Sequence, residues 1–84
     1  MLYHSVHFRK QWKRLPPRVK DEVDVRTGVL QVSEFDSSLN NHKLSGKYAE
    51  YRSINVTSDI RIIYKRVSGG FYLFAIGTHS EMYK

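Results

Sequence analysis

The C-terminal half of this 84-residue chain holds four side chains suited to acid–base and anion chemistry: His42, Arg61, His79 and Tyr83. Histidine can exchange protons near neutral pH because its ordinary pKa is about 6.5. Arginine stays charged and can contact two oxygens of an anion at once. Tyrosine offers an aromatic face or a phenol donor. These types predict a site that moves protons and stabilises negative charge, provided that the fold brings them together.

Short apolar runs surround these residues and predict the strands that must position them. They are rich in Ile, Val, Tyr and Phe and are separated by turn residues, which is typical of an antiparallel meander; the runs are Tyr51–Val56, Ile60–Val67 and Phe71–Ile76. Ser68-Gly69-Gly70 predicts a tight turn, since glycine tolerates positive φ. Thr57-Ser58-Asp59 predicts the other turn, with the Asp59 side chain bonding nearby backbone N–H groups.

The N-terminal half predicts one strand and a first helix. Residues 2–7 alternate and favour a strand, while Phe8, Trp12 and Leu15 share one helical face within a basic segment. Pro16 and Pro17 should end this helix and start another, because proline suits the first turn of a helix and not its interior.

The second helix is predicted to run to about Ser33. Val19, Val23 and Leu30 follow helical spacing, although Gly28 leaves a strand at residues 29–32 as an alternative. We favour the helix because acidic residues crowd its first turns, where the helix dipole stabilises them; they are Asp21, Glu22 and Asp24.

Together these elements predict a single α+β domain over residues 1–84. Two N-terminal helices would pack on one face of a small antiparallel four-stranded sheet, in the order β-α-α-β-β-β. The expected core is Trp12, Leu15, Val19, Val23, Leu30, Phe35, Ile54, Ile63 and Phe74.

The charge and composition narrow the classes of partner and chemistry. A net charge of +6 and an isoelectric point near 9.8 favour polyanionic partners, either nucleic acid or an acidic protein. The chain has no cysteine, and His4 and His7 would lie on opposite sides of a strand, so we expect no metal site and no cofactor. Without a long apolar stretch or a secretion signal, we expect a soluble cytoplasmic protein and no membrane partner.

Four segments in order are similar to one known family. LNNHKLSG at 39–46, YR at 51–52, DIRIIYK at 59–65 and GTHSEMY at 77–83 resemble the RelE/ParE toxin superfamily. The Gly-Thr-His-Ser ending is most similar to its YafQ branch, and residues 8–17 are similar to the family's opening helices. The resemblance implies a compact RelE-like fold and a type II toxin that cuts mRNA on the ribosome. It also implies a cognate antitoxin as partner, expected to be acidic and partly disordered.

The resemblance assigns roles for a metal-free attack of a ribose 2′-OH on the adjacent phosphate. His79 matches the general acid, Arg61 the cation that stabilises the phosphorane, and His42 the general base. Tyr83 matches an aromatic that contacts substrate, and Asp59 a carboxylate near the site. Structural alternatives remain open: His42 and His79 as ordinary loop histidines, Arg61 as an edge charge, Tyr83 as packing, and Asp59 as a turn residue, which we favour.

Two basic sets predict contacts with RNA phosphates, through largely sequence-independent affinity. The first set lies on the first predicted helix and consists of Arg9 and Lys13. The second set is expected around the proposed site and consists of Lys43, Lys47, Arg52, Lys65 and Arg66.

The sequence also departs from the YafQ pattern at three positions. Asn55 stands where that branch usually has a second histidine, Ile60 where it has an aromatic, and Ala75 where it has an arginine. Arg61 could replace the missing arginine from the neighbouring strand. The alternative function is a non-catalytic ParE-like toxin or binding module that inhibits gyrase or another protein.

Overall fold

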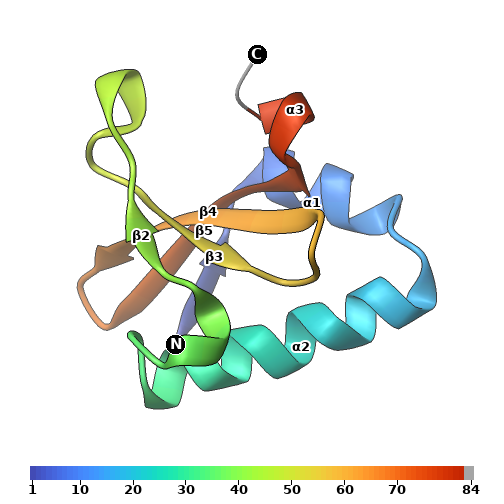
Figure 1. The fold of residues 1–84 in the computed structure, drawn as a ribbon, viewed down its shortest axis with the longest axis horizontal. Helices are drawn as coiled ribbons and strands as arrows, with labels where there is room; N and C mark the ends of the chain where they lie inside the picture. The colour runs from blue at the N-terminus through green and yellow to red at the C-terminus, as the bar shows by residue number, and fades with distance from the viewer. Residues whose placement is uncertain (83–84) are drawn as a thin grey trace.

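The computed structural model describes residues 1–82 of the chain, with the side chains of residues 1–80. Figure 1 shows α2 running across one face of a twisted sheet, with α3 on the other side. In chain order the elements are β1 (Leu2–His4), α1 (Val6–Lys13), α2 (Pro17–Val32), the short 3-10 helix η1 (Ser37–Leu39), β2 (His42–Lys43), a second 3-10 helix η2 (Gly46–Tyr48), β3 (Arg52–Asn55), β4 (Ile60–Val67), β5 (Gly70–Thr78) and α3 (His79–Met82).

The α+β class is confirmed, but the sheet has a fifth strand and is not wholly antiparallel. Within residues 1–82 the strand order is β1-β5-β4-β3-β2, and β1 runs parallel to β5. A parallel edge strand pairs with a partner far along the sequence, so no turn residue marks its neighbour. β2 has only two residues, which is too short to show any alternation of apolar and polar side chains. Both differences were therefore invisible to pattern analysis.

β1 ends three residues earlier than predicted because Ser5 caps the first helix. The Ser5 Oγ accepts a hydrogen bond from the Phe8 N–H at 2.8 Å and donates to the Phe74 carbonyl at 2.6 Å. α1 then lies against β5, where the Ile76 N–H donates to the Gln11 Oε1 at 2.9 Å. The helix thus satisfies part of the β5 edge that the short β1 leaves unpaired.

The second helix is confirmed over residues 17–32, so the alternative strand at 29–32 is wrong. Its first turn holds no acidic residue, and therefore the dipole argument does not explain where it begins. Pro17 at the first helical position and the buried face of Val23, Thr27 and Leu30 explain it better. Even this longest helix has 16 residues, and no helix in the described part of the chain is long and apolar enough to cross a membrane.

Two apolar clusters lie on opposite faces of the sheet. The main core lies on the α2 side and includes Leu30, Ile62 and Tyr64. A smaller cluster contains Ile63 and Ala75, with Leu44, Tyr51 and Phe74 packed against it. Neighbouring residues of a strand point to opposite faces, so Ile62 and Ile63 had to separate.

Three members of the predicted core are therefore placed differently. Ile63 and Phe74 belong to the cluster on the face away from α2, and not to the layer under the helices. Phe35 is 61% exposed and belongs to neither cluster. The prediction counted apolar residues without assigning each one to a face of the sheet.

Candidate functional site

The structure brings two of the predicted site residues into contact. The Arg61 Nη1 lies 3.2 Å from the His42 Nε2, although the residues are 19 positions apart. His42 is paired with Ser53 across β2 and β3, and Arg61 is paired with Asn55 across β3 and β4. Strand alternation places both side chains on the face away from α2. We call this contact the His42–Arg61 pair.

The hydrogen bonds of the pair define the tautomer of the imidazole. The His42 Nδ1 lies 2.9 Å from the Asn40 carbonyl oxygen, which can only accept, so the Nδ1 carries the proton. The Nε2 then presents its lone pair to the Arg61 N–H. Asn40 has a left-handed backbone with φ 44°, and it is the C-cap of η1. A neutral imidazole with an accepting Nε2 beside a fixed cation can take a proton from a group held by that cation.

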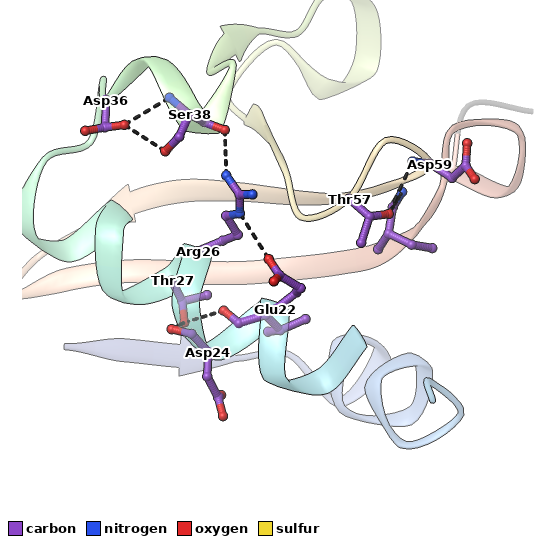
Figure 2. A network of polar contacts seen from close by, with 10 residues as sticks. Glu22, Asp24, Arg26, Thr27, Asp36, Ser38, Thr57 and Asp59 are labelled. Atoms are coloured by element: carbon purple, nitrogen blue, oxygen red, sulfur yellow. Dashed lines mark hydrogen bonds and ion pairs between the residues drawn. The ribbon is translucent and has the colours of Figure 1, made fainter. Parts of the chain in front are cut away.

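The segment before His42 is held at Ser38, the middle residue of η1. The Asp36 Oδ1 accepts from the Ser38 hydroxyl at 2.7 Å and from the Ser38 N–H at 2.9 Å. These bonds, with the hydroxyl as the larger cause, hold the pKa of Asp36 below its usual range. Figure 2 shows Arg26 reaching from α2 between Glu22 and the Ser38 carbonyl, which accepts at 2.9 Å. α2 thereby fixes the strand entry that carries His42.

His79 follows the last strand as predicted, and it begins the short helix α3, so the alternative of a loop histidine does not describe its backbone. Gly77 is the register partner of Arg61, and Thr78 that of Ile60. His79 therefore lies two residues beyond the partner of Arg61, at the same end of the sheet, and its side chain is exposed. The backbone thus carries His79 to the end of the sheet from which Arg61 projects.

Asp59 lies in the β3–β4 turn, but it does not bond the turn as predicted. The Thr57 Oγ1 accepts from the N–H groups of Asp59 at 3.2 Å and Ile60 at 3.1 Å. In Figure 2 the Asp59 carboxylate points away from Thr57. Asp59 is exposed at the same end of the sheet as His79. Tyr83 lies outside the described residues, so its role stays a prediction.

Two polar residues of β3 were not predicted as site residues, although Asn55 was noted as a departure from the family pattern. The Ser53 Oγ and the Asn55 Oδ1 are buried, and neither has a hydrogen-bond partner within residues 1–82. Both lie on the face of the His42–Arg61 pair, since Ser53 is paired with His42 and Asn55 with Arg61. Leaving a buried polar atom unsatisfied costs about 1–3 kcal/mol. Polar residues alternating with Ile54 and Val56 were the signal that could have identified them.

An aromatic cluster lies on the same face as the pair. The Tyr51 and Phe74 ring centroids are 5.0 Å apart, and Tyr48 is 6.3 Å from each. The ammonium of Lys47 lies over Tyr48 at 5.2 Å, and that of Lys65 over Tyr51 at 5.3 Å. Two of the predicted RNA-binding lysines are therefore held over aromatic rings.

The remaining predicted RNA-binding residues lie elsewhere. Arg52 and Arg66 contact the side of Phe35 near Tyr64, which belongs to the α2 side of the sheet. Lys43 is exposed in β2 as the register partner of Arg52, while Arg9 and Lys13 are exposed on α1. The predicted basic set thus divides between two faces of the sheet and a helix. Within residues 1–82, no group of three side chains could hold a metal ion.

Comparison with known proteins places the chain among toxins. A family model described as "Bacterial toxin of type II toxin-antitoxin system, YafQ" matches residues 2–84. The structure of YafQ from E. coli BL21(DE3) is 19% identical, with TM-score 0.86, covering 100% of this chain and 98% of that chain. YafQ in the E. coli DinJ–YafQ toxin–antitoxin complex is 20% identical, with TM-score 0.82 and coverage of 100% and 97%.

A more distant structure shares the same fold. The match in the YoeB–YefM complex from Staphylococcus aureus is 11% identical, with TM-score 0.82, covering 94% of this chain and 95% of that chain. The search of curated proteins found no significant match. At these identities the solved structures establish the fold.

Proposed function

The chain belongs to the YafQ family of bacterial toxins of type II toxin–antitoxin systems, and on this premise we propose that it is a ribosome-dependent mRNA endonuclease. The observation that supports this proposal most directly is the His42–Arg61 pair. It combines a proton acceptor and a permanent cation on one exposed face, which is what cleavage of a phosphodiester without metal requires.

In the proposed reaction, the His42 Nε2 takes the proton of the ribose 2′-OH. The 2′ oxygen then attacks the adjacent phosphorus in line while the bond from phosphorus to the 5′ oxygen breaks. A protonated His79 donates its proton to that departing oxygen, leaving a 2′,3′-cyclic phosphate and a 5′-OH. The Arg61 guanidinium stabilises the added charge on the phosphorane.

The contact within the pair suggests how substrate would activate the base. In the free protein the Arg61 N–H occupies the His42 Nε2 lone pair at 3.2 Å. A phosphate oxygen is a stronger acceptor for a guanidinium than a neutral imidazole is, because the bond is charge-assisted. When Arg61 turns to the phosphate, the His42 Nε2 becomes free to accept the 2′-OH proton.

We also propose that this toxin binds a cognate antitoxin. The E. coli relative was solved in a complex with DinJ and the Staphylococcus aureus relative in a complex with YefM. An acidic, partly disordered segment would complement the net charge of +6.

The cleavage proposal is tested by adding purified protein to ribosomes that carry a defined mRNA and mapping the ends by primer extension. We expect cuts in the ribosomal A site, and we expect His79→Ala and Arg61→Ala each to reduce them by at least about 100-fold while retaining the wild-type melting temperature. Arg14→Ala is the control, since Arg14 is an exposed arginine at the C-cap of α1 that the proposed reaction does not use. No cleavage by the wild-type protein on translating ribosomes would refute the enzyme assignment.

One observation favours the non-catalytic alternative. Ala75, where the YafQ branch has an arginine, is 4% exposed and packs with Ile63, so the strand supplies an apolar contact at that position instead of a cation. A ParE-like toxin would act through protein contacts. Inhibition of gyrase supercoiling by a protein that cuts no ribosome-bound mRNA would establish this alternative.

A further inference from the structure

Phe35 is an exposed aromatic ring with two arginines over it. The ring is 61% exposed, and the guanidinium carbons of Arg52 and Arg66 lie 5.1 Å and 5.8 Å from its centroid. Guanidinium groups stack on aromatic faces. We call these three residues the Phe35 cluster.

A hydrogen-bonded network holds both arginines in place. The Arg66 Nε donates to the Glu34 Oε1 at 2.6 Å, and the Arg52 Nε donates to the Asn41 Oδ1 at 2.7 Å. Tyr64 joins the two halves: its hydroxyl donates to the Glu34 Oε2 at 2.7 Å and accepts from the Asn41 Nδ2 at 2.6 Å. The Glu34 side chain is only 8% exposed, so the network is anchored in the protein.

The network engages the inner nitrogens of the arginines and leaves outer ones available. Both terminal amino groups of Arg52, and one of Arg66, have no protein acceptor within residues 1–82. The groove beside them has a volume of about 480 Å³ and also includes Lys43, Lys65 and Glu50. Four cations thus face two carboxylates there, and Glu34 is already paired with Arg66.

We propose that the Phe35 cluster binds an unpaired RNA nucleotide, whose base stacks on Phe35 and whose phosphate contacts Arg52 and Arg66. Any base presents an aromatic face, and the preorganised guanidiniums supply donors for phosphate oxygens. An acidic peptide could engage the arginines but would leave the exposed ring without a stacking partner. The inference rests on the proposed action on RNA, but the cluster lies on the α2 side of the sheet, away from the His42–Arg61 pair.

The test uses the full chain carrying Arg61→Ala, without ribosomes, so that cleavage is suppressed, and phenylalanine ring signals are followed by NMR. The probes are a single-stranded RNA hexamer, an abasic oligonucleotide with the same number of phosphates, and a glutamate-rich peptide of equal charge. We expect the hexamer to shift the Phe35 ring signals and to bind about ten-fold more tightly than the abasic probe.

Variants separate stacking from charge. Phe35→Leu should weaken hexamer binding about ten-fold with an unchanged melting temperature, while Val32→Ala, another exposed apolar residue at 89% exposure, should leave binding unchanged. Arg52→Lys should weaken binding less than Arg52→Met does, because it retains the charge.

Equal binding of the abasic probe, or wild-type affinity in Phe35→Leu, would overturn the proposal. Tighter binding of the acidic peptide at this cluster would overturn it in favour of a protein partner. The assay contains no ribosome and no cleavage step, so its failure leaves the nuclease proposal untouched. Conversely, a protein that cuts no mRNA can still bind the hexamer here.

Discussion

Strand β4 carries two polar assemblies that differ in how their members are held. Arg61 projects to one face, where its hydrogen bond joins it to His42, an exposed residue on an edge strand. Tyr64 projects to the other face, where it is 0% exposed and bonds both Glu34 and Asn41. The first assembly can exchange its contact for a substrate group, whereas the second cannot do so without exposing buried polar atoms.

The difference extends to proton chemistry. Burial first, and then the hydrogen bond to Glu34, raises the pKa of the Tyr64 phenol well above its usual range, so it stays protonated at neutral pH. The same carboxylate raises the pKa of Arg66 through a hydrogen bond and its charge. These groups are locked in one protonation state, which suits a support. The lone pair of the His42 Nε2 is engaged only by the exposed Arg61 side-chain contact, which a substrate group can replace, and this suits a reacting group.

The largest expected effect is on cleavage by the His42–Arg61 pair. We expect His42→Ala and Arg61→Ala each to reduce the cleavage rate about 10²–10³-fold, because in the proposed reaction one supplies the base and the other the charge. Since they act as one unit, the double variant should lose much less than the product of the two losses. Single-turnover cleavage on ribosomes measures this. If the loss of rate in the double variant equals the product of the two single losses, His42 and Arg61 act independently. The description of them as one assembly would then be wrong.

The next effect is on stability and should come from the other assembly. We expect Tyr64→Phe to lower the free energy of unfolding by about 1–3 kcal/mol, because Glu34 and Asn41 each lose a buried partner. Arg61→Ala should change it by less than about 0.5 kcal/mol. Tyr3→Phe is the matched control at an exposed tyrosine. Urea denaturation decides the matter, and a larger loss from Arg61→Ala would reverse the roles of the two regions.

Alkaline pH should reveal the locked phenol. A folded-state pKa above the unfolded value of about 10 means that the contribution of Tyr64 to stability is fully present below pH 10. It is lost progressively as the pH rises further, because the unfolded phenol releases its proton while the folded one retains it. The urea midpoint of the wild-type protein should therefore fall more steeply above about pH 10 than that of Tyr64→Phe. Parallel slopes would place the alkaline sensitivity in other groups.

The sequence predicted the parts of the molecule that local pattern determines. Helix 17–32 follows from proline position and helical spacing, and the meander from its apolar runs and its turn at Gly69, which has φ 80°. The type and chain position of His42 and Arg61 were evident, but their contact depends on the register of β2 with β3 and of β3 with β4. A two-residue strand carries too little pattern to predict that register.

Phe35 shows the opposite limit. An aromatic residue in a polar connector is statistically a core residue, and we predicted it as one. The structure instead places it outside both apolar clusters, under two arginines that come from β3 and β4. Phe35 and Arg66 are 31 positions apart in the chain, and no spacing in the sequence indicates that they are in contact. Only the folded structure reveals this surface.

The smallest expected effects distinguish two adjacent asparagines that serve the two regions. Asn40 presents its backbone carbonyl to His42 from a left-handed conformation, so Asn40→Gly should keep both activity and stability within about two-fold and 0.5 kcal/mol. Asn41 contributes its side chain to Tyr64 and Arg52, so Asn41→Gly should lose about 1–2 kcal/mol of stability. Urea denaturation and ribosomal cleavage are measured on both variants. Suppose instead that Asn40→Gly lowers the free energy of unfolding more than Asn41→Gly does. The residue that positions His42 would then stabilise the fold, and the distinction between the replaceable His42–Arg61 contact and the fixed Tyr64 network would fail.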